Sequence, residues 1–378
     1  MCGSEGTSEV ADHVLGRPIS RRAALAVGST AVGAAVLATS ACSPAQSPQS
    51  PQSPQSPPAL PDNALITLGV AAGPPPTLNR YGISSALKIG SDVYVIDCGL
   101  GSLNAFTNAG LQYGDLKSMF ITHLHADHIV DYYSFFLSGG NQAPPGRAPI
   151  VVYGPGPAGG LPPSRVGNPN PATIDPAHPT PGLAATTNAL HQAFAYTGNV
   201  LIRDQGIDDI EDLVNVVEIA VPPGSDYQNR SPNMVPFPVV SDDNVAVTAT
   251  LVSHNDVYPA FAFRFDFKKP AVSVTFSGDT TKSDNLITLA QDTDILVHEA
   301  EFSLDDAYWH NRFPPGYLQR SHTSAEQVGE VAAAAKAKQV ILSHYQPADL
   351  PDAQWLDEIK KNYSGKATVA KDGQVFPL

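Results

Sequence analysis

Cysteine and basic side chains are both scarce in this 378-residue sequence, and each shortage excludes a class of protein. Only Cys2, Cys42 and Cys98 occur, and the first two fall within or directly after an N-terminal segment that we interpret as an export signal. Cys98 then stands alone in the folded body, which excludes an intramolecular disulfide framework. It ends the apolar run VYVIDC, so we expect a small core residue rather than a nucleophile.

Lysine and arginine total 22 against 36 aspartates and glutamates, which gives a formal net charge of −14. Nucleic-acid binders normally present an excess of Lys and Arg to phosphate groups. We therefore expect no nucleic-acid partner, and interpret the charge as the solubility charge of a secreted protein. The apolar share of 42% is typical of a globular protein with a sizeable core.

Residues 1–41 have the pattern of a twin-arginine export signal. Arg21 and Arg22 precede the weakly apolar run AVGSTAVGAAVLATSA, which is rich in glycine and alanine. A transmembrane helix usually contains more Leu, Ile and Phe, so an uncleaved anchor is the weaker interpretation. We expect export to the cell envelope, the periplasm or the exterior.

Residues 42–61 predict a linker rich in serine, proline and glutamine. Cys42 follows Ala41 as in a lipoprotein processing site, although Thr39 stands where such signals usually carry leucine. The repeat SPAQSPQSPQSPQSPP cannot form a helix or a sheet, because proline fixes φ and lacks an N–H donor. A lipid anchor at Cys42 would therefore hold the folded domain away from a membrane surface.

Residues 62–378 predict one α/β domain. Short β-branched or aromatic runs such as ALITLGV, KSMFITH, AVSVTFSGD and QVILSHY indicate strands, and SAEQVGEVAAAAKA and TNALHQAFAYTGNVLIRD indicate helices. The strands form two blocks, each ending in strand–helix alternation, which predicts two halves packed face to face with helices outside. Residues 139–243, approximately, are predicted to be an inserted loop and helix segment that either covers the substrate or decorates the surface.

The string THLHADH at residues 122–128 predicts a metal site. His123 and His125 can point toward one metal from the end of a strand, and Asp127 and His128 can reach a second. Imidazole and carboxylate ligands suit zinc. So dense a pattern is improbable by chance.

Three further candidates each follow an apolar strand, where a buried scaffold can deliver a polar group to a shared rim. They are His254 after NVAVTATLVS, Asp279 after AVSVTFSG and His344 after QVILS. A lone histidine at a strand end is more often structural than a ligand. The ordered set of seven residues favours ligands.

The order HLHADH, VSH, SGDT, HEA, HTS and LSH resembles the metallo-β-lactamase superfamily, and specifically its ribonuclease Z-like and arylsulfatase-like branch. The resemblance covers residues 64–346 and implies a four-layer αββα sandwich with two divalent metals, zinc or manganese. It assigns one metal to His123, His125 and His254, and the other to Asp127, His128 and His344. Asp279 would bridge the two.

The resemblance also implies that Glu299 in LVHEAEF and His322 in RSHTSAE act together beside the metals. A histidine held by a carboxylate can protonate a leaving oxygen or stabilise a charged transition state. Asp127 would orient the attacking hydroxide. The alternatives are that His322 caps the helix that begins near Ser324, and that Glu299 is a surface acid.

Three positions depart from the family pattern or leave it open. Asp131 stands where the family commonly has glycine. His298 and Glu301 flank Glu299, so the sequence leaves open which acid points inward.

A hydroxide shared by two metals suits hydrolysis of a polarised electrophile. We therefore expect an exported binuclear hydrolase of a small ester, with a phosphodiester or aryl sulfate first and a lactonase or β-lactamase-like activity as the alternative. The export signal, the negative charge and the lack of a basic Gly-rich arm disfavour tRNA processing. A non-catalytic, lipid-anchored metal- or ligand-binding protein is the alternative of another class. The oligomeric state is left open, with a homodimer among the options.

Overall fold

The computed structural model describes residues 59–378 apart from 140–145, 166 and 311. The predicted export signal, Cys42 and the linker up to residue 58 lie outside the described residues, so they stay predictions. Within the described part of the chain, no helix is both long enough and apolar enough to span a membrane.

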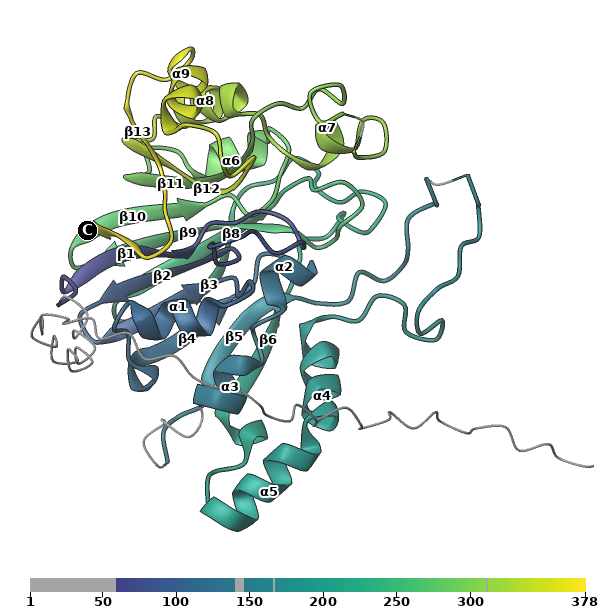
Figure 1. The fold of residues 1–378 in the computed structure, drawn as a ribbon, viewed down its shortest axis with the longest axis vertical. Helices are drawn as coiled ribbons and strands as arrows, with labels where there is room; N and C mark the ends of the chain where they lie inside the picture. Colours follow the sequence, from purple (N-terminus) through teal and green to yellow (C-terminus); the bar gives the residue numbers. More distant parts are fainter. Residues whose placement is uncertain (1–58, 140–145, 166, 311) are drawn as a thin grey trace, which may run out of the picture. The chain divides into compact units, whose positions relative to one another are not determined.

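Two seven-stranded sheets form the centre of the domain (Figure 1). The first sheet has the order β14 (Gln374–Pro377), β1 (Asn63–Gly69), β2 (Ser84–Ile89), β3 (Asp92–Ile96), β4 (Leu116–Phe120), β5 (Ile150–Pro155) and β6 (Val214–Ile219). The second has the order β13 (Lys366–Val369), β12 (Gln339–Gln346), β11 (Ile295–Glu301), β10 (Ala271–Phe276), β9 (Phe261–Lys268), β8 (Val245–Leu251) and β7 (Phe237–Ser241).

Helices cover the outer faces of both sheets, which gives the predicted αββα sandwich. The first sheet is covered from α1 (Ser102–Asn108), α3 (Ser134–Gly139) and α4 (Leu183–Ala193), and the second from α6 (Asp284–Leu289), α8 (Ala325–Ala334) and α9 (Asp352–Lys360). The remaining helices are α2 (Ala126–Ile129), α5 (Ala195–Gln205) and α7 (Tyr317–Ser321), with short 3₁₀ turns η1 (Tyr113–Asp115) and η3 (Ile210–Leu213). The fold class is confirmed.

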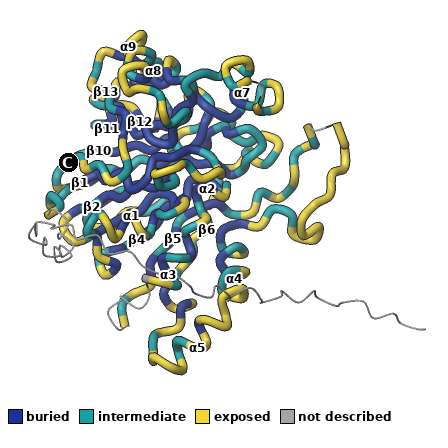
Figure 2. Tube along the Cα trace, in the orientation of Figure 1, coloured by how far each residue is buried: buried dark blue, intermediate teal, exposed yellow. Residues whose placement is uncertain are grey.

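Alternation along the strands explains why the sheets pack on both faces. In β1, Leu65 joins the core shared with the second sheet, whereas Ile66 joins the core beneath the helices of the first sheet. Phe120 of β4 contacts Phe263 and Phe265 of β9 edge to face, with ring centroids 5.7 and 4.9 Å apart. In Figure 2 the buried residues, coloured dark blue, are concentrated in the strands at the centre of the domain. Cys98 is a free, fully buried core residue, as predicted.

The predicted insertion at 139–243 is only partly peripheral. β5 and β6 extend the first sheet and β7 extends the second, so these residues are integral to both layers. What projects from the sandwich is the loop at 156–182, described apart from residue 166, and helix α5 beyond the end of α4 (Figure 1). The predicted long helix here is divided at Phe194.

The C-terminal strand closes the first sheet beside its first strand. β14 pairs antiparallel with β1 from Ala64–Pro377 to Thr67–Gln374. Just before it, the Asp372 carboxylate accepts hydrogen bonds from the backbone N–H groups of Val70 and Tyr81, at 3.0 and 2.7 Å. The end of the chain thereby fixes the loop that follows β1.

Candidate metal centre

All seven predicted ligands converge at one edge between the sheets. The loop after β4 and the short helix α2 carry the THLHADH residues, and the turns after β8 and β10 carry His254 and Asp279. His344 lies inside β12 with a positive φ of 48°, which turns its side chain out of the strand's regular alternation. One nitrogen or oxygen from each member of the groups His123–His125–His254 and Asp127–His128–His344 lies within 4.8 Å of the others in its group.

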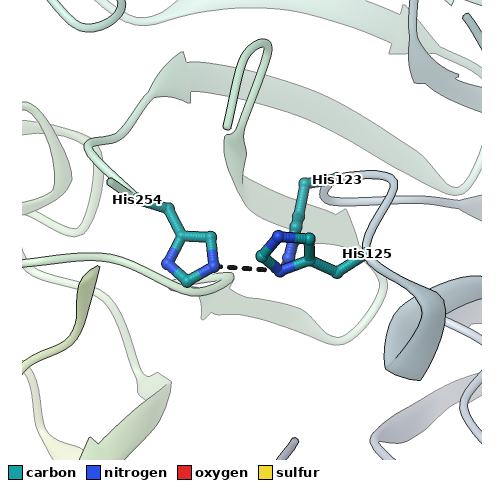
Figure 3. A group of neighbouring side chains, drawn as sticks. All are labelled: His123, His125 and His254. Atoms are coloured by element: carbon teal, nitrogen blue, oxygen red, sulfur yellow. Dashed lines mark hydrogen bonds between the residues drawn. The ribbon is translucent and has the colours of Figure 1, made fainter. Parts of the chain in front are cut away.

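Three histidines form the first group, and two of them are visible in contact in Figure 3. His254 Nε2 lies 3.1 Å from His125 Nδ1, and the His123 ring centroid lies 4.9 Å from that of His254. The other nitrogen of His254, Nδ1, is 2.7 Å from the backbone oxygen of Ser321. Donation to that carbonyl makes Nε2 the unprotonated nitrogen that faces the other two histidines.

Asp279 lies between the two groups. Its Oδ1 atom is 3.4 Å from both His128 Nε2 and His344 Nδ1, and its Oδ2 atom is 3.7 Å from His254 Nε2. His344 Nε2 in turn lies 3.2 Å from Asp127 Oδ2. One carboxylate oxygen therefore faces each group, which is the arrangement of a bridging ligand.

Glycine is required beside this aspartate. Gly278 has a φ of +57°, and a Cβ atom there would lie 2.5 Å from the backbone oxygen of Phe261. The left-handed turn brings Asp279 back toward the centre directly after β10.

Five buried atoms of this set have no hydrogen-bond partner: His123 Nε2, Asp127 Oδ1, His128 Nε2, Asp279 Oδ1 and His344 Nδ1. A buried polar atom without a partner costs about 1–3 kcal/mol, so such a concentration would be unfavourable in a purely structural cluster. Imidazole nitrogens and carboxylate oxygens are usual ligands of divalent metals. The residues present therefore fit divalent ions, as the fold implies.

Burial and neighbouring charges give His123, His254 and Asp279 the protonation states that metal binding needs, whereas the carboxylates around His128 outweigh its burial and raise its pKa. Burial lowers the pKa of His123 well below its ordinary value and that of His254 to about 3, so both imidazoles are neutral. Burial alone would raise the pKa of Asp279, but the neighbouring His344 and His128 outweigh it and hold that pKa well below its ordinary value.

Asp97, which the sequence interpretation overlooked, supports the second group. It is buried at the end of β3 and its Oδ2 atom lies 2.9 Å from His128 Nδ1. Its carboxylate also accepts hydrogen bonds from the backbone N–H and the hydroxyl of Thr122, at 2.8 and 2.9 Å. Asp97 therefore holds the His128 ring with Nε2 toward Asp279. Asp97 could have been predicted from the sequence, because it directly follows an apolar strand, as several of the ligands do.

Glu299 and His322 meet beside the metal ligands, as predicted for a pair. His322 Nδ1 lies 3.2 Å from Glu299 Oε2, and the backbone N–H of Thr323 donates to Glu299 Oε1 at 2.9 Å. The His322 ring centroid is 5.0 Å from that of His254. Glu299 is 3% exposed, so the alternative of a surface acid is wrong.

The alternative role for His322 is also wrong. Helix α8 is capped by Ser324, whose side chain accepts from Gln327 N while the Gln327 side chain accepts from Ser324 N. Glu301 is buried as well, but it accepts a hydrogen bond from Gln346 at 2.6 Å. Of the two acids, Glu299 is the one that contacts His322.

Asp131 has a structural role at the position where the family commonly has glycine. Its Oδ2 atom accepts from the backbone N–H of Leu103 at 2.9 Å, in the first turn of α1. This satisfies a donor that the start of a helix leaves without a partner. The departure therefore leaves the metal centre unchanged.

Two family models match the chain. The "Beta-lactamase superfamily domain" matches residues 181–345, and "Anti-Pycsar protein Apyc1" matches residues 64–135. Among curated proteins, the ribonuclease Z of Mycobacterium avium (strain 104) is 26% identical over 313 residues, which is 81% of this chain and 95% of that protein. The ribonuclease Z of Mycobacterium marinum is 25% identical over 315 residues, with 81% and 96% covered.

Solved structures share the fold. The metallo-β-lactamase fold protein YhfI from Bacillus subtilis superposes with a TM-score of 0.55 at 17% identity, over 83% of this chain and 99% of that one. The short form of human tRNase Z gives a TM-score of 0.54 at 20% identity, with 83% and 98% covered. The two-sheet sandwich and its metal-binding edge thus define a hydrolase of the metallo-β-lactamase superfamily. Within it, this chain resembles the ribonuclease Z-like branch, to which it is similar over 95–96% of the length of the two mycobacterial relatives.

The expectation of no nucleic-acid partner is overturned by these relatives, which are named as ribonucleases, whereas the small-ester substrate stays a prediction. That expectation relied on the net charge of −14 over the whole chain. Charges on a protein surface are screened beyond about 10 Å, so local charge near a site matters more than the sum. Arg165 and Arg230 both pair with Asp256, close to His254 in the chain.

Proposed function

We propose that this chain is a metal-dependent phosphodiesterase whose substrate is a nucleic-acid phosphodiester. The observation that carries the proposal is the position of Asp279 between two ligand groups, with the Glu299–His322 pair alongside. Support for the phosphodiester comes from the relatives named ribonuclease Z. We propose zinc as the metal, because five of the seven ligands are imidazoles.

Two bound divalent ions would supply Lewis acidity and lower the pKa of a water molecule. The Asp127 carboxylate has one oxygen near His344 and one without a partner, so the free oxygen can accept a hydrogen bond from the attacking water. These residues would orient the attacking water before the reaction, at the buried edge between the sheets where the negative charge of the transition state develops.

His322 would act as the general acid that protonates the leaving group. Its Nδ1 atom is held by Glu299, which leaves Nε2 as the nitrogen that can pass a proton to the departing oxygen. One nitrogen of His322 lies within 4.8 Å of ligand atoms of His254 and Asp279, so this proton would be delivered next to the reacting phosphate. Proton delivery matters most for a poor leaving group such as the ribose oxygen of a nucleic acid.

We further propose that the enzyme acts outside the cytoplasm. Support comes from Arg21-Arg22 with the Gly/Ala-rich run behind it, and from Cys42 ahead of the Ser-Pro-Gln repeat. Such a route would export a chain that had folded and taken up its metals beforehand. Replacement of both arginines with lysine tests this proposal.

A substrate panel tests the activity. The metal-loaded protein would be offered a short single-stranded RNA, bis(p-nitrophenyl) phosphate, an aryl sulfate, a lactone and a cephalosporin, with and without a chelator. We expect metal-dependent hydrolysis of the two phosphodiesters. Preferred hydrolysis of the sulfate, lactone or cephalosporin would replace the proposed reaction. Two bound metals without any turnover would identify a non-catalytic binding protein.

A further inference from the structure

A groove of about 630 Å³ lies beside the metal centre, and its wall is formed by three separate segments. They are the parts of the projecting loop at 161–165 and 169–173, the pair Asn255–Asp256 that follows His254, and helix α7 with Pro314 before it. By contrast, the space behind His128, Asp279 and His344 has only about 30 Å³. Sites for small ligands usually have about 300–1,000 Å³, so the groove can hold the part of a substrate that the centre cannot.

Hydrogen bonds fix the groove relative to the metal centre. The backbone N–H of Asn255 donates to the Arg320 oxygen at 2.7 Å, and His254 Nδ1 lies 2.7 Å from the next oxygen along, that of Ser321. The ring of Tyr317, on the groove wall, has its centroid 6.4 Å from that of His322. A ligand in the groove would therefore lie next to His254 and His322.

The groove carries positive charge. The Asp256 carboxylate is paired with Arg165 at 2.7 and 2.9 Å and with Arg230 at 3.3 Å, and the side chain of Arg165 is 49% exposed. Arg320, a third guanidinium, lines the groove, and its Nε atom is buried without a hydrogen-bond partner. Three guanidinium groups around one carboxylate leave an excess of positive charge, in a chain whose net charge is −14. Guanidinium groups suit phosphate oxygens.

We propose that this groove, the arginine groove, binds the single-stranded nucleic-acid segment next to the scissile phosphate. Arg320 and Arg165 contact a neighbouring phosphate, and Tyr317 stacks on an unpaired base. A base can stack on an aromatic side chain only when it is not paired in a duplex, which is why the segment is single-stranded. The inference rests on the proposed phosphodiesterase function and adds the part of the substrate that the metal centre does not touch.

Two substrates separate the groove from the centre. Bis(p-nitrophenyl) phosphate has no second phosphate or base, whereas a short single-stranded RNA has both. We expect Arg320→Ala to raise the KM for the RNA by roughly tenfold or more, the effect of losing one charge-assisted contact. The log–log salt slope should also become shallower by about one. Kinetics with the aryl phosphodiester should stay unchanged.

Tyr317 gives a second, independent pair of variants. Tyr317→Leu should raise the KM for the RNA, and Tyr317→Phe should keep it, because only the ring is needed for stacking. The matched charge control is Lys338→Ala, which removes one positive charge from the exposed pair with Asp294. This lysine is not among the residues that line the groove.

The outcomes distinguish the two proposals. Equal effects of Arg320→Ala and Lys338→Ala on the RNA, or equal effects of Arg320→Ala on both substrates, would overturn the arginine groove. Hydrolysis of the aryl phosphodiester without any response of RNA kinetics to Arg320→Ala would do the same, and the phosphodiesterase would stand. If the wild type hydrolyses neither phosphodiester, the proposed function fails. Fluorescence anisotropy of labelled RNA, with wild type and Arg320→Ala compared, then still tests the groove.

Discussion

His128 Nδ1 lies 2.9 Å from Asp97 Oδ2, and both side chains are buried. This contact leaves His128 Nε2 as the nitrogen directed at Asp279. Partners that orient a metal-binding histidine in this way typically affect metal affinity or activity by about 10- to 100-fold. Asp97 is therefore a positioning residue for the second metal.

Replacing Asp97 should weaken metal binding. We expect Asp97→Ala to bind the second metal about 10- to 100-fold more weakly, measured by competition with a chelating dye. The matched control is Asp131→Ala, which removes another carboxylate, one that lies after α2 and caps α1 instead. That variant should lose up to about 2 kcal/mol of stability and keep its metal affinity. Unchanged affinity in Asp97→Ala would mean that the His128 contact is dispensable.

Replacing His322 should affect turnover and leave the metals in place. We expect His322→Ala to retain both metals and to lose about 100- to 10,000-fold in kcat with an RNA substrate. The loss with bis(p-nitrophenyl) phosphate should be far smaller, because p-nitrophenolate departs without a proton. Metal content by mass spectrometry and kcat for both substrates make the measurement. Loss of metal from the variant would show that the ligands are wrongly assigned.

Glu299→Gln provides a companion to that variant. The amide can still accept from Thr323 N but cannot stabilise a charged His322. We expect a loss of kcat in the same direction as His322→Ala, and a double variant no worse than the more severe single one. Additive losses would argue against a functional pair.

Glu301 should make stability depend on pH. Burial raises its pKa to about 8, so the folded state keeps the proton while the unfolded state loses it near the ordinary value of 4.5. The unfolded chain therefore binds fewer protons between about pH 4.5 and 8, and the free energy of unfolding falls as pH rises through this window. Above pH 8 the contribution no longer changes.

The neutral variant isolates that contribution. Glu301→Gln should match the wild type near pH 4.5 and be more stable by a few kcal/mol near pH 8. Denaturant unfolding at both values, with metals removed from both proteins, gives the comparison. A stability difference that does not change with pH would exclude the buried, protonated Glu301.

The export signal is tested in cells. Replacing Arg21 and Arg22 together with lysine should leave the precursor inside, as followed by cell fractionation. Arg17→Lys is the matched control, since it changes a nearby arginine outside the pair. Continued export of the doubly substituted chain would refute the twin-arginine interpretation.

The ligands could be predicted from the sequence because most of them lie close to the end of an apolar strand, and ends of neighbouring strands meet at one edge. Asp97 and Thr122 were missed because their role is a contact across 25 residues, which no local pattern reports. The arginine groove was missed for the same reason. Arg165 pairs with Asp256 across 91 residues. The net charge of the whole chain does not show such a local group of arginines.

Edge strands escaped the sequence interpretation too. β13 and β14 have four residues each, too few for a clear alternating pattern. β14 is defined by its pairing with β1, about 300 residues earlier in the sequence, rather than by its own composition. The division of the predicted helix at Phe194 depends likewise on packing, since its ring stacks on Tyr133 at 5.5 Å.

The pairing of β14 with β1 also makes the final residues a safeguard against self-association. Without Gln374–Pro377, β1 would become the border of the sheet, and its backbone N–H and C=O groups would face outward from a nearly fully buried, apolar strand. Such a border is a template on which another chain can add a strand. Loss of these few residues would therefore make the protein prone to aggregate, even though the metal ligands were all still present.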